Sequence, residues 1–296
     1  MKMWNLWKEK SDKKQEEVKR KEEQGEAEML SEIVKELDRN TSKEVIRIRL
    51  NKKPVSLTGS KYGGVPYLPS EGEVPCDVQG RQMRLLAQLR LEELPENHIY
   101  PPEGILQFWA LDDDCTGLDF EDPVSQSGSR ILYYKEIDET VTEEQVLARY
   151  HPYCEKESYF PIQTTFGLEF SLETEGISPE DFQFDERFAK CWNQKFPEKK
   201  IDSCMELSDE VSEMLYDQRS GFGHKIGGYP AFTQEDPRDM ENEYGAYLIL
   251  LLQIDSVGIG DDEIMWGDSG ICNFFIQEED LLKLDFDRVM YNWDCY

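Results

Sequence analysis

The chain has 296 residues, with 33 Lys or Arg against 62 Asp or Glu, and a net charge of −29 at pH 7. Because nucleic-acid binding relies on Lys and Arg side chains that displace counterions from phosphates, this charge argues against direct binding of DNA or RNA. The same charge speeds encounter with a basic protein, so a basic protein partner is one expectation. An acidic surface that only keeps the protein in solution is the alternative.

The N-terminal segment, residues 1–44, is predicted to be a charged helix. Residues 1–40 hold 10 basic and 11 acidic side chains, so almost all of the net charge lies in the rest of the chain. Residues 8–28 are mostly Lys, Glu, Gln and Asp, which is typical of a solvated helix, whereas apolar residues recur at helical spacing over 29–37 and predict a docked face. Trp4 and Trp7 are either part of a partner surface or fold back onto the body of the protein.

Cysteine usage and the absence of long apolar runs indicate the compartment. The seven cysteines are odd in number, widely spaced and without a Cys-x-x-Cys pair, which argues for reduced thiols and against a disulfide framework or a zinc site. The longest apolar run, 247–252, is far shorter than the roughly 20 residues that span a bilayer. We therefore expect a cytoplasmic protein with no membrane association, no bound metal and no cofactor.

Three sequence blocks occur twice in the same order. Lys, Gly, Gly and Pro have identical spacing in Lys61–Pro66 and Lys225–Pro230; the two later pairs of blocks are 85–89 with 250–254, and 104–109 with 270–275. The offset between the copies drifts only from 164 to 166 residues. Three matches in one order predict an internal duplication.

The blocks Ser60–Pro69, Leu251–Asp255 and Trp266–Gly270 also resemble the bacterial YwqG-like family, a domain of unknown function. The resemblance extends from about residue 46 to residue 296. It implies an α+β fold with an internal duplication and a cytosolic bacterial protein, often encoded beside secreted polymorphic toxins. The family supplies no catalytic residues that could be carried over to this chain.

The expected elements divide the chain into four parts. After the helix of 1–44 come a first β repeat over 45–138, a helix-rich insertion over 139–223 and a second β repeat over 224–296, with 45–296 forming one compact domain. Strands are predicted over 45–50, 83–91, 104–111, 130–137, 247–255, 271–277 and 286–293, because apolar residues alternate or run together there. Within the insertion, residues 160–173 are expected to be extended, either as a hairpin or as one long bent strand. Neighbouring strands with segregated helices predict an α+β fold of two related antiparallel units that share a core.

One glutamine interrupts the central apolar strand of each copy, Gln88 in the first and Gln253 in the second. A buried amide without partners costs about 1–3 kcal/mol, so each glutamine needs hydrogen bonds. We expect each side chain to tie its strand to the backbone of its own Gly-Gly loop.

Familiar catalytic and metal-binding patterns are incomplete. Gly267-Asp268-Ser269-Gly270 matches a protease nucleophile loop in letters, but its composition is typical of a turn and no histidine has a triad context. The run 112–117 resembles a calcium loop, but Pro123 stands where the bidentate Glu is needed, so the alternatives are an acidic loop without metal and one that binds calcium adventitiously. The Gly-Gly blocks lack the context of a phosphate loop. No catalytic residue is therefore assigned.

The favoured function is a non-enzymatic protein-interaction module, with a toxin-immunity-like role as one form of it; the alternative is a small-ligand binder or unrecognised enzyme with its site between the two repeats. His224 is either a general base beside such a site or a structural histidine, and the two matched lysines either pair with local carboxylates or receive an anion. The candidate ligand or partner residues are Lys61, Gly63, Gly64, His224, Lys225, Gly227, Gly228, Trp266 and Asp268. The sequence does not predict an oligomeric state.

Overall fold

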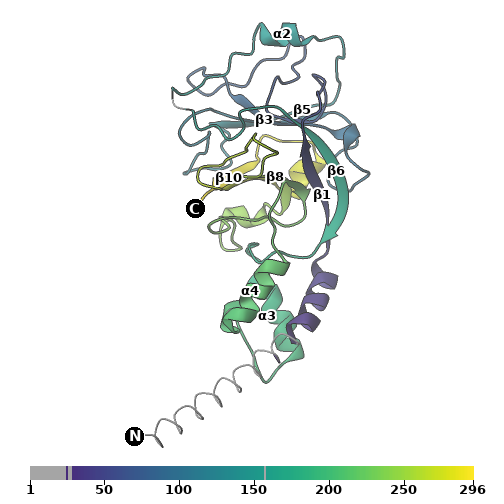
Figure 1. Cartoon of the computed structure of the whole chain (residues 1–296), viewed down its shortest axis with the longest axis vertical. Helices are drawn as coiled ribbons and strands as arrows, with labels where there is room; N and C mark the ends of the chain where they lie inside the picture. Colours follow the sequence, from purple (N-terminus) through teal and green to yellow (C-terminus); the bar gives the residue numbers. More distant parts are fainter. Residues whose placement is uncertain (1–24, 26–28, 157) are drawn as a thin grey trace, which may run out of the picture. The chain divides into compact units, whose positions relative to one another are not determined.

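The computed structural model describes residues 25, 29–156 and 158–296 (Figure 1). The chain divides into two compact units. One unit combines residues 1–42 with 176–221, and the other combines 43–175 with 222–296. This division groups most of the expected insertion with the N-terminal segment.

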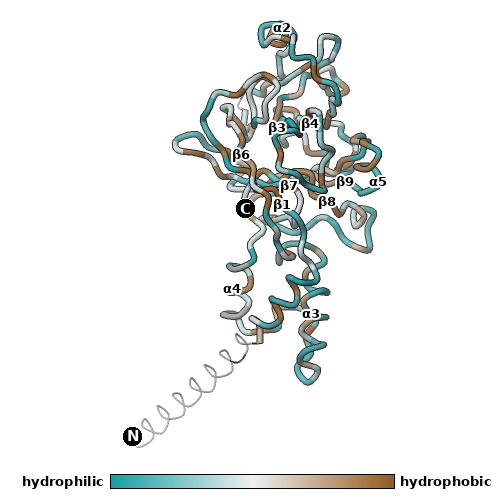
Figure 2. Tube along the Cα trace, turned by 90° about the vertical axis from the view of Figure 1, so that its right-hand side faces the viewer, coloured by the Kyte–Doolittle hydropathy of each residue, from teal (hydrophilic) through white to brown (hydrophobic). Residues whose placement is uncertain are grey.

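The first unit is helical. It contains a helix over 29–41, α3 (Phe184–Lys195), the 3-10 turn η2 (Cys204–Glu206) and α4 (Asp209–Gln218). Leu30, Ile33 and Leu37 are buried, so the predicted apolar face over 29–37 is docked, whereas the solvated helix expected over 8–28 lies almost entirely outside the described residues. Hydrophobic and hydrophilic segments alternate along these helices, as expected of amphipathic elements (Figure 2).

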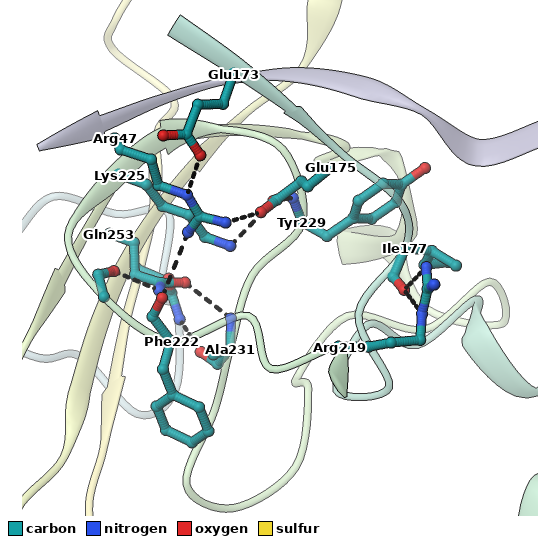
Figure 3. A network of polar contacts seen from close by, with 12 residues as sticks. Arg47, Glu173, Glu175, Ile177, Arg219, Phe222, Lys225, Tyr229, Ala231 and Gln253 are labelled. Carbon is teal, nitrogen blue, oxygen red and sulfur yellow. Dashed lines mark hydrogen bonds and ion pairs between the residues drawn. The ribbon is translucent and has the colours of Figure 1, made fainter. Parts of the chain in front are cut away.

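Within this unit, the Arg219 guanidinium binds the backbone at residue 177, two positions after the strand that ends at Glu175. Its Nε and Nη2 donate to the carbonyl oxygen of Ile177 at 3.1 and 2.9 Å (Figure 3). Its Nη1 lies 2.7 Å from the carboxylate of Asp38, on the helix of 29–41. One side chain therefore links the two sequence segments that make up the unit.

The second unit is built on one ten-stranded sheet in the described part of the chain, in the order β10-β9-β8-β7-β1-β6-β2-β3-β4-β5. Every strand pair is antiparallel, and with the helices this gives an α+β protein. Short helical elements connect the strands: η1 (Leu91–Glu93), α2 (Glu143–Leu147), η3 (Glu243–Ala246) and α5 (Glu278–Leu282). The strands are β1 (Lys43–Asn51), β2 (Lys61–Tyr62), β3 (Arg84–Arg90), β4 (Ile105–Ala110), β5 (Ser129–Tyr134), β6 (Phe166–Glu175), β7 (Lys225–Gly227), β8 (Ile249–Asp255), β9 (Ile271–Ile276) and β10 (Met290–Asp294).

The long strands β1 and β6 form the centre of the sheet and pair along their full lengths, from Lys43 opposite Glu175 to Asn51 opposite Gly167 (Figure 1). β6 lies in the segment that the sequence analysis assigned to a helix-rich insertion. Its apolar residues fall at every second position, which is the strand period, so the local pattern agrees with the structure.

The two groups of flanking strands have the same register. Lys61 of β2 lies opposite Gln88 of β3, and Lys225 of β7 lies opposite Gln253 of β8. The pairing of β3 with β4 has a register shift between Leu85 and Ala87, and the pairing of β8 with β9 has one at the matching place, between Leu250 and Leu252.

The hydrogen bonds of the two glutamines confirm the predicted ties to the loops. Gln88 Oε1 accepts from the backbone N–H of Tyr67 at 2.8 Å, and Gln253 Oε1 accepts from that of Ala231 at 2.8 Å. Both glutamines are fully buried. Each amide therefore fastens the loop that follows its Gly-Gly pair onto the outer face of the sheet.

The inner faces of the two strand groups share one core. Phe108 of β4 packs against Phe274 of β9 with 4.9 Å between ring centroids, and Tyr62 of β2 meets His224 edge to face. The loop between β4 and β5 contacts the terminal strand β10, where the backbone N–H of Tyr291 donates to the carbonyl of Pro123 at 2.9 Å. This arrangement brings residues from both halves of the sequence around a common interior.

Candidate functional site

Lys225 is held inside the sheet by an ion pair. Its Nζ lies 3.0 Å from Glu175 Oε1, and the same oxygen accepts the backbone N–H of Tyr229 at 2.7 Å (Figure 3). The other oxygen of Glu175 accepts from Arg47 Nη2 at 2.6 Å. Local pairing with a carboxylate is therefore the arrangement found for Lys225.

The second Gly-Gly pair encloses that same carboxylate. Gly227 and Gly228 have φ of +70° and +68°, a region that residues with a Cβ rarely adopt. A Cβ on Gly228 would collide with Oε1 of Glu175, and one on Gly227 would collide with Ile99. The Gly-Gly turn thus cradles an anion supplied by the chain itself.

Lys61 has the matching place in the other strand group but different partners. Its Nζ donates to the carbonyl oxygens of Ser56 and Leu57 at 3.0 and 2.9 Å. Burial lowers the pKa of Lys61 to about 8, although the carboxylates of Glu143 and Glu93 oppose the shift. The two matched lysines therefore do not share a site.

His224 is fixed by the backbone on both sides of its ring. Nε2 lies 2.8 Å from the carbonyl oxygen of Val257, and Nδ1 lies 3.1 Å from the backbone N of Asp255. These partners require a proton on Nε2 and a free pair on Nδ1. Burial lowers the pKa of His224, which favours this neutral form, so the structural role is the one its contacts support.

The remaining sequence candidates lie apart from β7. Trp266 is buried in the shared core, and Asp268 is exposed in a turn closed by the hydrogen bond from Gly270 N to Trp266 O at 2.6 Å. Ser269 is exposed in the same turn with φ of +70°. On the first Gly-Gly pair, Gly63 donates its N–H to Leu86 O at 2.9 Å, and Gly64 is exposed.

Gly64 borders a hollow of about 390 Å³ whose charged lining residues, Arg84 and Asp112, are paired with each other. Arg84 Nη1 lies 3.0 Å from Asp112 Oδ2, and Ser158 donates to Asp112 Oδ1 at 2.6 Å. In the neighbouring loop, Asp113 Oδ1 accepts the backbone N–H of Gly117 at 2.9 Å. The acidic loop therefore uses its first two carboxylates internally, and the described residues contain no His, Cys, Asp and Glu cluster suited to a metal ion.

An apolar groove of about 580 Å³ lies beside the second Gly-Gly pair. We call it the leucine groove. It takes residues from both halves of the sequence: the start of β1, the loop before β4, the Gly-Gly turn, the start of β8, and α5 with the residue two positions beyond it. The lining residues that carry the argument are Glu44, Tyr100, Gly228, Leu248, Leu282 and Leu284.

Three leucines of the groove are unusually exposed. Leu282 is 78% exposed, Leu248 is 44% and Leu284 is 38%. Leu284 also has φ of +57°, which costs a residue with a Cβ about 1–2 kcal/mol. Apolar side chains gathered around a hollow, one of them on a strained backbone, are the features of a binding surface.

Charged groups surround the leucines. Glu44 accepts from both the backbone N–H and the ring Nδ1 of His98, at 3.0 and 2.9 Å, which lowers the pKa of Glu44 and raises the pKa of His98. Lys43 Nζ lies 4.2 Å from the centre of the Tyr229 ring. The segment 278–287 contributes five acidic residues against one lysine, so the side of the groove formed by α5 is negative.

Tyr100 closes the inner end of the groove. Its hydroxyl donates to the carbonyl oxygen of Leu251, and the side chain is buried. In the first strand group the corresponding carbonyl, Leu86 O, takes the N–H of Gly63 instead. β8 pairs with β7 only at Gln253, whereas β3 pairs with β2 at two positions. The two strand groups therefore differ in how far these neighbouring strands stay paired.

Sequence reasoning placed Gly227 and Gly228 at a candidate site, and both line the leucine groove. It did not find Tyr100, Leu282 or Leu284. A signal was present in the sequence: a five-residue helix needs one buried apolar position, yet 281–284 holds three leucines, of which only Leu281 is buried.

Residues 60–295 match the model of a protein family described as domain of unknown function DUF1963. The chain belongs to this family. A search of curated proteins finds no match. Within the residues that the structure describes, no helix is both long and apolar enough to cross a membrane.

Proposed function

We propose that this DUF1963 protein is a non-catalytic binding module whose leucine groove holds an apolar, positively charged segment of a protein partner. The observation that carries the proposal is the exposure of Leu248, Leu282 and Leu284 around a hollow of about 580 Å³ next to the acidic segment 278–287. Fully burying one leucine side chain contributes about 1.5–3 kcal/mol, so these residues can supply a useful affinity.

The charge of the partner follows from the charge around the groove. Lys43 and His98 already face Tyr229 and Glu44, whereas Glu278 is exposed and lines the groove. Basic residues that flank an apolar segment would meet these carboxylates, and the net charge of −29 would steer the encounter at low salt.

The contacts of the other candidates support a binding role over a catalytic one. His224, Lys225 and Lys61 make their polar contacts with partners of the chain itself, in the strands and the loops beside them. A general base or nucleophile needs a free pair or proton directed at a substrate. The described histidine and lysines of the Gly-Gly blocks hold the sheet together instead.

On the sequence resemblance, we further propose that the protein is YwqG-like, bacterial and cytoplasmic, and that its partner is a basic toxin domain. The common register of Lys61 with Gln88 and of Lys225 with Gln253 supports an origin by internal duplication.

A small apolar molecule is a second candidate for the groove. The volume of about 580 Å³ falls within the range of roughly 300–1,000 Å³ typical of small-molecule sites, and Tyr100 and Leu250 bring the two halves of the sequence together there. A neutral ligand would bind independently of salt, which separates it from the basic segment.

The test is a fluorescence-anisotropy titration of the full-length protein with a labelled amphipathic peptide of about 14 Leu and Lys residues. We expect binding that weakens several-fold between about 0.05 and 0.5 M salt. The Leu282→Glu variant should bind at least about ten-fold more weakly, a loss of about 1.4 kcal/mol. A Leu–Glu peptide with the same apolar pattern should not bind.

The matched control is Val78→Glu, which introduces the same charge at a residue that is 95% exposed and is not among those lining the groove. Equal loss of affinity in both variants, or none in Leu282→Glu, would contradict the proposal. Binding of a neutral apolar dye that Leu282→Glu weakens, without any binding of the peptide, would favour the small-molecule alternative.

A further inference from the structure

One basic and apolar segment is present in the chain itself. Residues 1–14 contain five lysines and two acidic residues, in a chain whose net charge is −29. The first seven positions include five apolar residues, namely Met1, Met3, Trp4, Leu6 and Trp7. These residues lie outside the part of the chain that the structure describes.

This composition complements the leucine groove. Tryptophan side chains bury about 150–250 Å² each and dominate the energetics of interfaces, and the groove offers exposed leucines to cover them. The five lysines of 1–14 would face the five acidic residues of 278–287. Apolar fit and opposite charge thus point to the same pair of segments.

We propose that the leucine groove binds residues 1–14 of a second copy of this chain. The inference rests on the proposed function, and it makes the protein its own partner when no other basic segment is present. Because the segment comes from another copy, the contact does not require the chain after residue 14 to reach the groove of the same copy. Reciprocal exchange of two segments would close a symmetric dimer.

The chain contains the means to separate the two contributions. Trp4→Ala/Trp7→Ala removes the aromatic residues of the segment and leaves the groove intact, whereas Leu282→Glu alters the groove and leaves the segment intact. Leu282 is 78% exposed, so its replacement should leave the fold unchanged, as a thermal unfolding curve would show.

The experiment is sedimentation velocity of the full-length proteins over about 1–100 µM at about 0.05 and 0.5 M salt. We expect the wild type and the Val78→Glu control to associate as concentration rises, more strongly at low salt. Each of the other two variants alone should require at least about ten-fold higher concentration to associate. An equimolar mixture of the two should recover association, because one supplies the segment and the other the groove.

A wild type that stays monomeric throughout, or association that Leu282→Glu does not weaken, would overturn the inference. Failure of the mixture to associate would also overturn it, since the contact would then not be made between copies. The Leu–Lys peptide tests the proposed function separately. If a monomeric wild type binds that peptide, the groove is still a binding site, but residues 1–14 of a second copy are not what it binds.

Discussion

The Lys225 ammonium lies 3.0 Å from Glu175 Oε1, and the lysine side chain is fully buried. This ion pair joins β7 to the end of β6 on either side of β1, at the place where the Gly-Gly turn leaves the sheet. Breaking a buried pair by removing one partner leaves an uncompensated charge and typically costs about 3–5 kcal/mol.

Glu175→Ala should therefore destabilise the protein more than Lys225→Met. The first change removes the carboxylate that faces both Lys225 and Arg47, whereas the second leaves Glu175 with Arg47 and the N–H of Tyr229. We expect a loss of about 3–5 kcal/mol for Glu175→Ala in urea unfolding. A larger loss for Lys225→Met would show that the lysine, not the carboxylate, is the critical charge.

Gly228→Ala should be more costly than Gly80→Ala. Both glycines have positive φ, +68° and +78°, so both alanines carry the backbone cost of about 1 kcal/mol. Only at Gly228 would the new Cβ strike the carboxylate of Glu175, while nothing lies within 4 Å of a Cβ at Gly80. The two variants should differ in unfolding free energy by about 1–3 kcal/mol, which is the cost of the collision between the new Cβ and Glu175. Equal losses would mean that the Glu175 side chain moves away without cost.

Gln88→Leu should lose at least about 2 kcal/mol of stability although the side chains are similar in size. The amide accepts from Tyr67 N and donates to the carbonyls of Leu57 and Gly59, each at 2.8–2.9 Å. Leucine would leave these buried backbone groups without partners, at about 1–3 kcal/mol for each unsatisfied group. Chemical unfolding compares the variant with the wild type, and an unchanged midpoint would show that the loop finds other partners.

Stability should rise with pH between about 8 and 10.5 because of Lys61. The folded pKa is about 8 and the ordinary value is 10.5, so in this window the unfolded chain binds more protons than the folded one. The free energy of unfolding of the wild type should rise relative to that of Lys61→Met by up to about 1.4 kcal/mol per pH unit. Parallel curves of unfolding free energy against pH for the two proteins would contradict the lowered pKa.

Leu284→Gly should weaken peptide binding without a matching loss of stability. Glycine adopts the φ of +57° at little cost, which offsets the loss of a side chain that is already 38% exposed. Thermal unfolding measures the stability of the variant, and the Leu–Lys peptide titration measures its affinity. If affinity is unchanged, the strained leucine has no part in binding.

The strand pattern made much of the sheet predictable. β3, β4, β8 and β9 appear as continuous apolar runs, and a single glutamine in a buried strand demands hydrogen bonds, which is why its tie to the Gly-Gly loop could be foreseen. The start of α2 is also encoded locally, because Thr142 and Gln145 have the spacing of a capping box and form one in the structure.

The centre of the sheet and the leucine groove depend on long-range pairing. No local pattern places β6 between β1 and β2, or separates β8 from β7 beyond Gln253. Tyr100 reaches Leu251 across 151 positions, so its place at the groove follows from that strand order. His224 and Lys225 were visible as polar residues, but the pairing of His224 with Val257 O and of Lys225 with Glu175 depends on the folded chain.

Hydrogen–deuterium exchange of the full-length protein, with and without the Leu–Lys peptide, tests the binding site most directly. The account predicts slower exchange at 248–251 and 278–284, the segments that line the groove or continue β8 from it, and no change at the control loop 77–80. Protection confined to other segments, or absent while the peptide is bound, would contradict the assignment of the leucine groove as the binding site.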